Sequence, residues 1–271
     1  KYAPGRQLVL GGVWMTGAAA LAAASGLRAG AGLVGIAASN DETAAIYRRY
    51  ERALLTAEAV DVGDWRALLN RFQPDCLVLG PGLSNHPDPM RWIKVGLEEV
   101  PQAVIDADGL NAFQNNPDDF FALLGPNMVL TPHQGEFDRL FGHLFGPGPN
   151  ADDHNGAGAE AETRSGKQLL SRLERAQIAA KQAGCTVVLK GNDTIIASPD
   201  GRCLINANAP VSLATAGSGD VLAGIIGALS ARGMPGFDAA AAGVWFHGRA
   251  ASQVAGPLIA DDLLDHLSTT V

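Results

Sequence analysis

Short apolar runs alternate with longer segments of helical periodicity along most of the chain. The runs are continuously apolar, which predicts strands buried on both faces. They are residues 8–10, 33–37, 76–79, 103–105, 128–130 and 187–189. Helices are predicted at residues 17–27, 65–72 and 91–99. Buried strands that alternate with helices indicate a mainly parallel sheet flanked by helices, which is a three-layer α/β fold.

The pattern changes after residue 190. Residues 194–197 and 202–205 flank Ser198-Pro199-Asp200-Gly201, which is typical of a β-hairpin. Helices are then predicted at 218–231, 237–254 and 260–267. Residues 142–166 are rich in Gly and Pro and nearly free of large apolar side chains, which indicates a flexible insertion. We expect one domain over residues 1–271.

Polar, glycine-bearing segments directly follow four of the predicted strands. They are residues 80–82, 106–111, 131–136 and 190–194. Open α/β sheets bind ligands at the carboxyl ends of their strands, so these segments predict one shared site. We expect Asp106 and Asn111 to line it.

The segment Ala216-Gly217-Ser218-Gly219-Asp220 precedes an apolar helix. Gly217 and Gly219 allow consecutive amides to face one point, and the free amides of a helix N-terminus attract anions. This turn therefore predicts a site for a phosphate or an oxyanion. Asp220 could simply cap the helix. Because two glycines cost more backbone entropy than a cap requires, we favour a general base that accepts a proton from a hydroxyl.

Composition restricts the partners. The 271 residues carry a net charge of −8 without a basic stripe, which argues against nucleic acid or an anionic membrane as a partner. The chain has five lysines, so Lys190 in its Gly-rich segment is a candidate for phosphate binding. Cys76, Cys185 and Cys203 are too far apart for a zinc site or a disulfide framework, and we expect buried thiols. Residues 8–24 resemble a signal peptide only loosely, because glycines interrupt them.

The Gly-Ser-Gly-Asp segment before Val-Leu-Ala-Gly resembles the ribokinase-like superfamily. Other segments occur in the order found in one branch of it, the ADP- or ATP-dependent NAD(P)H-hydrate dehydratases. They are Gly11-Gly12, residues 17–19, residues 27–33, Leu79–Leu83, Ile105–Asn111, Thr131–Phe137 and Lys190–Thr194. The resemblance extends from about residue 6 to residue 267.

The resemblance implies a metabolite-repair lyase that dehydrates hydrated NADH or NADPH (the 6S form). ADP or ATP would phosphorylate the added hydroxyl, and phosphate and AMP or ADP would be released, with Mg²⁺ as cofactor. It also implies a cytoplasmic protein and a homotetramer. Neither the choice between the two nucleotides nor that between NADH and NADPH hydrates follows from the sequence. Nothing in it resembles the epimerase domain that some family members carry upstream.

The resemblance also assigns roles to individual residues. Asp220 would be the catalytic base, and Gly217 and Gly219 would contact the transferred phosphate. Ala18, Gly82, His133 and Asp220 would bind the hydrated substrate. Lys190, Gly191, Asn192, Asp193, Thr194 and Gly219 would bind the nucleotide. Glu136 would either bind Mg²⁺ through water or cap the next helix.

Two departures from the family pattern, the insertion 142–166 and a replaced residue pair, stay open together with two rival functions. Ala209-Pro210 replaces a Gly-Asn pair that is usual in the family, which puts the nucleotide contacts of that segment in doubt. A vitamin-alcohol kinase would share Asp220 and the anion site, and a nucleotide-binding sensor would tolerate loss of Asp220. His247 is interpreted as a packed or capping residue. The tryptophans are interpreted as core or rim residues, and they are Trp14, Trp65, Trp92 and Trp245.

Overall fold

The computed structural model describes residues 5–145 and 170–267, so most of the predicted insertion at 142–166 lies outside the described residues. The described residues form a nine-stranded sheet with the order β3-β2-β1-β4-β5-β6-β7-β8-β9. Strands β1 to β7 are parallel, β8 runs antiparallel to them, and β9 pairs antiparallel with β8. The bounds are β1 Arg6–Leu10, β2 Leu33–Ala38, β3 Leu55–Glu58, β4 Cys76–Leu79, β5 Ala103–Ile105, β6 Val129–Leu130, β7 Thr186–Leu189, β8 Thr194–Ala197 and β9 Cys203–Asn206.

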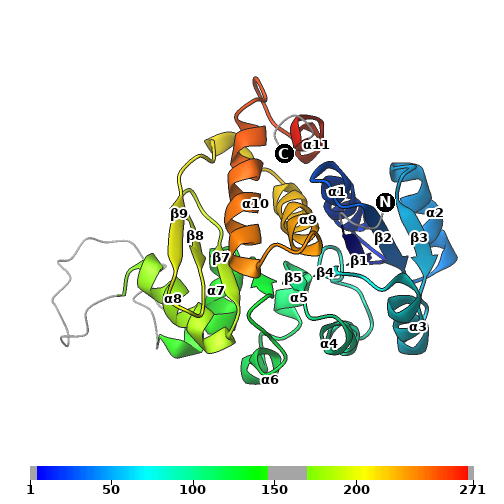
Figure 1. Ribbon diagram of the computed structural model, residues 1–271, viewed down its shortest axis with the longest axis horizontal. Coiled ribbons are helices and arrows are strands. Elements are labelled where there is room, and N and C mark those ends of the chain that lie inside the picture. Colours follow the sequence, from blue (N-terminus) through cyan, green and yellow to red (C-terminus); the bar gives the residue numbers. More distant parts are fainter. Residues whose placement is uncertain (1–4, 146–169, 268–271) are drawn as a thin grey trace, which may run out of the picture.

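Helices cover both faces of this sheet (Figure 1). One layer consists of α1 (Thr16–Arg28), α2 (Asp41–Tyr50), α9 (Ser218–Ala231), α10 (Gly236–Ala251) and α11 (Ala260–Leu267). The other consists of α3 (Val62–Phe72), α4 (Pro89–Glu99), α5 (Asp108–Asn111), α6 (Pro117–Phe121), α7 (Gln134–Phe141) and α8 (Arg172–Ala183). Short 3₁₀ turns lie at Gly142–Leu144 and Val211–Leu213. The predicted three-layer α/β fold is confirmed.

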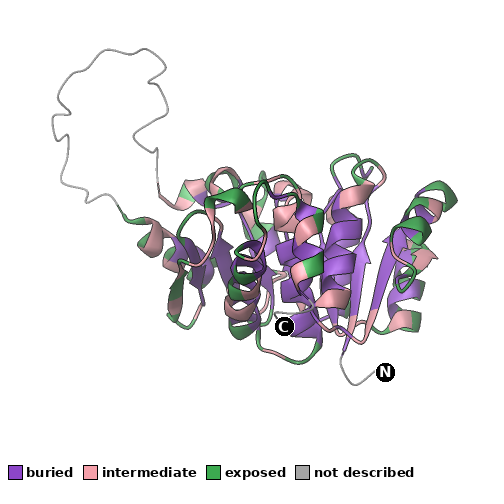
Figure 2. Cartoon of the chain, turned by 90° about the horizontal axis from the view of Figure 1, so that it is seen from above, coloured by how far each residue is buried: buried purple, intermediate pink, exposed green. Residues whose placement is uncertain are grey.

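The strands are buried because their successive side chains enter two separate cores. In β4, Cys76 and Val78 face the layer that contains α9, whereas Leu77 and Leu79 face the layer that contains α4. This alternation explains why the sequence of β4 is apolar throughout. Figure 2 shows the buried strands between helices that are exposed on their outer sides.

The order of the strands reverses direction beside β1. The chain runs from β1 to β2 and β3, and then returns to the other side of β1 as β4. At this reversal the loops that follow β1 and β4 touch, since a Cβ atom on Gly12 would lie 1.5 Å from the Gly82 carbonyl oxygen. Such a reversal is where open α/β sheets commonly bind ligands.

Close packing of α1 against α9 sets the position of the Gly217–Asp220 turn. A Cβ atom on Gly224 would lie only 2.0 Å from the carbonyl oxygen of Ala22, so the two helix backbones are nearly in contact. The alanine-rich sequence of α1 allows this approach, because its side chains add little bulk. The N-terminus of α9 is thereby held at the edge of the sheet where the parallel strands end.

Most predicted elements are confirmed within two or three residues at their ends. The helix predicted at 237–254 ends at Ala251, because the amides of Gln253 and Val254 bond three residues back and close the last turn. Several elements were not predicted, namely α2, β3 and α5 to α8. No helix among the described residues is long and apolar enough to cross a membrane.

Candidate active site

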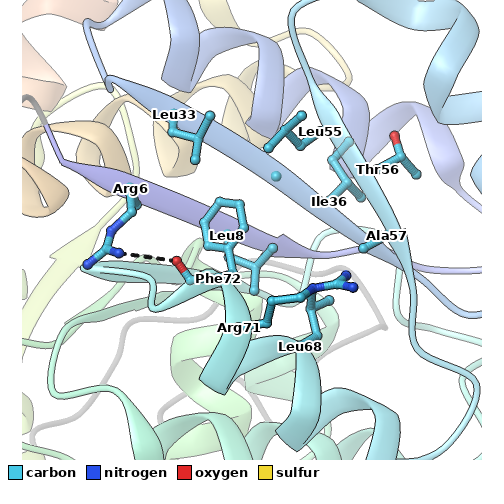
Figure 3. A pocket seen from close by; sticks show the side chains of 11 residues that line it. Arg6, Leu8, Leu33, Ile36, Leu55, Thr56, Ala57, Leu68, Arg71 and Phe72 are labelled. Atoms are coloured by element: carbon cyan, nitrogen blue, oxygen red, sulfur yellow. Dashed lines mark hydrogen bonds between the residues drawn. The ribbon is translucent and has the colours of Figure 1, made fainter. Parts of the chain in front are cut away.

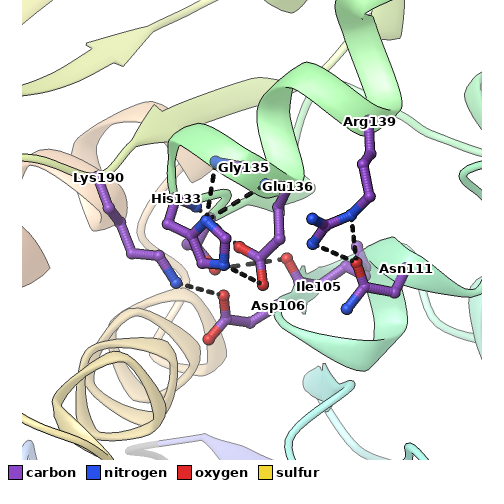
Figure 4. A network of polar contacts seen from close by, with 9 residues as sticks. Ile105, Asp106, Asn111, His133, Gly135, Glu136, Arg139 and Lys190 are labelled. Carbon is purple, nitrogen blue, oxygen red and sulfur yellow. Dashed lines mark hydrogen bonds and ion pairs between the residues drawn. The ribbon is translucent and has the colours of Figure 1, made fainter. Parts of the chain in front are cut away.

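The loops after β5 and β7 meet the N-terminus of α9 at one edge of the sheet. Lys190 Nζ lies 2.7 Å from Asp106 Oδ1, which joins the ends of β7 and β5 (Figure 4). A Cβ atom on Gly219 would lie 3.3 Å from Lys190 Nζ and 3.6 Å from Asp106 Oδ2. The prediction that these segments lie together is confirmed.

The turn before α9 presents free amides. Gly217 has a φ of 84°, in the left-handed region that favours glycine, and α9 begins directly after it without a side-chain cap. Within the described part of the chain, the amides of Gly219 and Asp220 donate no hydrogen bond to another residue. Free amides at a helix N-terminus form a binding site for an anion. The turn has the geometry that the sequence predicted.

Asp220 is a half-buried carboxyl in the first turn of α9. Burial, together with the nearby Asp106 carboxylate, raises its pKa from 3.8 to about 7, although the Lys190 ammonium acts in the opposite direction. A carboxyl that titrates near neutral pH can accept a proton far more readily than an ordinary aspartate. The structure thus gives Asp220 the basicity that proton abstraction requires.

Lys190 is the cation among these carboxyls. Burial lowers its pKa, but the carboxylates of Asp106, Glu136 and Asp220 outweigh burial and raise it. Its ammonium is therefore protonated at neutral pH. The Asp106 side chain is only 2% exposed, so the ion pair with Lys190 gives this buried side chain a partner of opposite charge. The pair engages Oδ1 of Asp106, while Oδ2 faces Gly219.

His133 and Glu136 form a capping box at the start of α7. The His133 Nδ1 atom accepts hydrogen bonds from the amides of Gly135 and Glu136, at 3.0 and 3.2 Å. In return, Glu136 Oε2 accepts a 2.8 Å bond from the His133 amide (Figure 4). Because Nδ1 is an acceptor, a neutral His133 carries its proton on Nε2, which lies 3.4 Å from Glu136 Oε1. The capping role of Glu136 is confirmed.

A cavity of about 370 Å³ opens beside β7 and β8. Four residues of the predicted nucleotide segment line it, together with residues of α9, α10 and the segment after β9. The lining comprises His133, Lys190, Gly191, Asn192, Thr194, Ala209, Pro210, Val211, Leu213, Ala214, Ser218, Gly219, Leu222 and His247. The lining thus combines polar side chains such as Lys190 and Asn192 with apolar ones such as Val211 and Leu222, a mixture typical of small-molecule sites.

Asp193 is the member of the predicted nucleotide segment that does not line this cavity. Its carboxylate instead pairs with the guanidinium of Arg172, at the start of α8. Arg172 Nη2 also donates a hydrogen bond to the Lys190 carbonyl at 3.3 Å. Arg172 thus fixes the segment from outside. The sequence carries no local signal for this contact, because Arg172 lies eighteen residues before Lys190.

The predicted substrate-binding residues fall into two groups along the sheet edge. His133 lies after β6 and lines the cavity, whereas Ala18 and Gly82 lie after β1 and β4. Gly82 is covered by the neighbouring loop, since a Cβ atom on it would lie 2.5 Å from the Met15 carbonyl oxygen. Asp220, which interacts with Asp106 and Lys190, belongs to the region between the two groups.

The structure also refines the residues with less specific predictions. His247 is buried as predicted, but it lines the cavity, and burial lowers its pKa to about 4, so it is neutral at pH 7. Asn111 Oδ1 accepts bonds from Arg139 at 2.9 and 3.2 Å (Figure 4). Cys76 and Cys185 are buried thiols, whereas Cys203 is half-buried. Trp65 and Trp92 stack in the core, with ring centroids 6.1 Å apart.

A second cavity, of about 460 Å³, lies at the opposite end of the strands (Figure 3). It is lined by the first residues of β1, β2 and β3 and by α3, and it is mostly apolar. Its two arginines are Arg6, which donates a 3.4 Å bond to the Phe72 carbonyl, and Arg71. Because no carboxyl or histidine is among its lining residues, this cavity lacks acid–base groups.

Comparisons with known proteins find matches over nearly the whole chain. A family model described as Carb_kinase, NAD(P)H-hydrate dehydratase, matches residues 7–271. The ADP-dependent (S)-NAD(P)H-hydrate dehydratase of Neisseria meningitidis is 33% identical over 91% of this chain and 76% of its own length. The bifunctional NAD(P)H-hydrate repair enzyme Nnr of Moorella thermoacetica is 36% identical over 97% of this chain, which spans about half (48%) of that protein.

A similar fold occurs in a crystal structure of the ADP/ATP-dependent NAD(P)H-hydrate dehydratase of Bacillus subtilis, co-crystallised with ATP and Mg²⁺. The TM-score is 0.71 at 24% identity, and the match covers 99% of this chain and 89% of that one. This likeness confirms the ribokinase-like fold that the Gly-Ser-Gly-Asp segment suggested.

Proposed function

Because the chain belongs to the NAD(P)H-hydrate dehydratase family, we propose that it uses ADP or ATP to dehydrate hydrated NADH or NADPH. The observation that carries this proposal is Asp220, a carboxyl with a pKa near 7 at the uncapped N-terminus of α9. A base and an anion site in one turn suit the transfer of a phosphoryl group to a hydroxyl. Restoration of the reduced coenzyme makes the protein a metabolite-repair lyase.

In the first step, the Asp220 carboxylate accepts the proton of the hydroxyl on the hydrated nicotinamide ring. The hydroxyl oxygen attacks the terminal phosphorus of the nucleotide, and AMP (or ADP, from ATP) leaves. The free amides of Gly219 and Asp220, with the ammonium of Lys190, stabilise the charge on the transferred group. In the second step the C–O bond breaks, phosphate leaves with the electron pair, and loss of a ring proton restores the double bond.

The cavity beside β7 and β8 suits the nucleotide in this proposal. Gly219 and Lys190 are among its lining residues, and the transferred phosphate would lie beside them. Ala209 and Pro210, the pair that departs from the family pattern, also line it. These two residues would contact the ribose or base through their apolar surface, so the substitution still leaves a wall for the nucleotide.

Mg²⁺ would be held by few protein groups. Among the residues that the structure describes, no cluster of three His, Cys, Asp or Glu side chains could hold a metal ion. Mg²⁺ commonly uses one or two carboxylates plus phosphate oxygens and water. Glu136 and Asp106 would supply carboxylate oxygens, and the bound ion would neutralise charge on the nucleotide phosphates. The donor set therefore fits a metal that arrives with its nucleotide.

Further proposals rest on the family resemblance. We propose that residues 1–271 form one catalytic domain, which the single continuous sheet supports. A homotetramer and a cytoplasmic location are carried over from the resemblance alone. The substrates would be small molecules, and the net charge of −8 argues against nucleic acid as a partner.

The decisive experiment incubates the protein with hydrated NADH, Mg²⁺ and either ADP or ATP. Recovery of the reduced-nicotinamide absorbance together with phosphate release is expected. Asp220→Asn should abolish recovery while nucleotide binding remains, and Asp119→Asn, which changes an exposed carboxyl on α6, is the matched control. Formation of a stable phosphate ester on a vitamin alcohol, without recovery of NADH from its hydrate, would contradict the proposal and favour the kinase alternative.

A further inference from the structure

Trp14 exposes a large aromatic side chain at an anchored position. The side chain is 73% exposed, yet the backbone on both sides is fixed. The Gly12 carbonyl accepts a 2.8 Å hydrogen bond from the Tyr47 hydroxyl, and the Met15 carbonyl accepts a 3.1 Å bond from the Ala18 amide. The backbone at Trp14 is therefore held in place while the indole ring remains exposed to water.

The location of Trp14 connects it with the ligand-binding edge. It follows β1, at the reversal in strand order between β1 and β4. The residues around it clamp the loop after β4, because a Cβ on Gly12 would meet the Gly82 carbonyl and a Cβ on Gly82 would meet the Met15 carbonyl. Trp14 lies between these two contacts in the sequence. It therefore lies in the loop after β1, at the reversal in strand order where open α/β sheets commonly bind ligands.

The direction in which a dinucleotide must extend follows from the cavity on the other side. The nucleotide co-substrate would occupy the cavity beside β7 and β8, and the reacting ring would lie near Asp220 and Asp106, which follows β5. The remainder of the dinucleotide then has to extend the other way, over β4 and β1. Two strand spacings, about 10 Å, separate β5 from β1, and the loop after β1 carries Trp14.

We propose that Trp14 stacks on the base at the non-reacting end of the dinucleotide substrate, and thereby selects the complete coenzyme over its mononucleotide half. This inference rests on the proposed function. An indole ring offers a broad apolar face that stacks on any base. The contact is remote from the reacting ring, so it contributes to binding of the substrate and not to the phosphoryl transfer itself.

The test compares two substrates, hydrated NADH and hydrated reduced nicotinamide mononucleotide, which lacks the adenylate half. Trp14→Ala should raise the KM for hydrated NADH by roughly tenfold, a typical loss for one base–aromatic stack, with kcat and the KM for ADP unchanged. For the mononucleotide, Trp14→Ala should leave kcat/KM unchanged relative to the parent protein. If the mononucleotide hydrate is not turned over, its inhibition constant against hydrated NADH should be unchanged instead. Trp14→Phe should restore most of the affinity for hydrated NADH.

Trp245→Ala is the matched control, because Trp245 is also an exposed tryptophan, at 49%, on α10. Trp245→Ala should not change the KM for one substrate relative to the other. Equal effects of Trp14→Ala on the two substrates, or no effect on either, would overturn the stacking role while leaving the dehydratase function intact. If the parent protein acts on neither hydrate with ADP or ATP, the proposed function fails, and the stacking role fails with it.

Discussion

The raised pKa of Asp220 implies that ionisation of this carboxyl lowers the free energy of unfolding. A rise from 3.8 to about 7 corresponds to roughly 4 kcal/mol in favour of the protonated carboxyl. Because Asp220 is half-buried and lies at the N-terminal end of α9, solvent and the helix amides stabilise the carboxylate and offset part of this energy. We therefore expect about 2 kcal/mol of the free energy of unfolding to be lost above neutral pH.

Asp220→Asn isolates this effect, because it removes the charge and keeps the shape. The folded-state pKa lies above the unfolded-state pKa, so the stability contributed by the protonated carboxyl is complete below about pH 4 and is lost as the pH rises to about 7. The Asn side chain does not titrate. The variant should thus match the parent near pH 4 and exceed it by about 2 kcal/mol at pH 8.

Urea unfolding followed by circular dichroism, without ligands, measures the difference at both pH values. In thermal unfolding at pH 8 the variant should melt about 4 to 8 °C higher than the parent. Asp119→Asn, the exposed control on α6, should show no difference that depends on pH. A difference of the same size at both pH values, or none at pH 8, would refute the assignment of this cost to the Asp220 charge.

Four further outcomes are expected. The kcat/KM should rise about tenfold per pH unit up to an apparent pKa of about 7 and then level, because Asp220 must be ionised to accept a proton; a flat pH–rate profile from pH 5 to 7 would contradict this. Gly219→Ala should leave the melting temperature nearly unchanged, since its methyl group would lie 3.3 Å from the movable Lys190 Nζ and at ordinary contact distance, 3.6 Å, from Asp106 Oδ2, but it should lower kcat about 100-fold. Gly217→Ala, at a φ of 84°, should instead lower the free energy of unfolding by at least about 1 kcal/mol. Arg172→Ala should raise the KM for the nucleotide severalfold with kcat unchanged, because the loop at Lys190 loses its anchor; an unchanged KM would show that the loop holds its shape alone.

The sheet and the edge that carries the site were predictable for simple physical reasons. Strands such as β4 are apolar throughout because both of their faces enter a core, and their short length distinguishes them from buried helices such as α9. The polar residues that follow these strands must lie close together, since parallel strands end at the same edge of the sheet. Asp106 and Lys190, eighty-four positions apart, form an ion pair for this reason.

Other features depended on packing that no local pattern encodes. The edge strand β3 exposes Leu55 and Glu58, so its sequence lacks the apolar run that marks a central strand. The pairing of Asp193 with Arg172 arises only when α8 packs beside β7. The sequence could place Asp220 in a helix turn, but the direction of its pKa shift required the burial and the neighbouring Asp106 carboxylate that folding supplies.

The backbone contact between Gly12 and Gly82 has a consequence for how this protein can change over evolutionary time. The two positions lie seventy residues apart, yet a side chain on Gly12 would collide with the Gly82 carbonyl oxygen. Because this oxygen belongs to the backbone, no substitution at position 82 removes the clash. We therefore expect both positions to remain glycine in related proteins. Val13 and Trp14 lie beside this locked pair without such a constraint, which makes them the positions where substrate preference can drift while the scaffold stays intact.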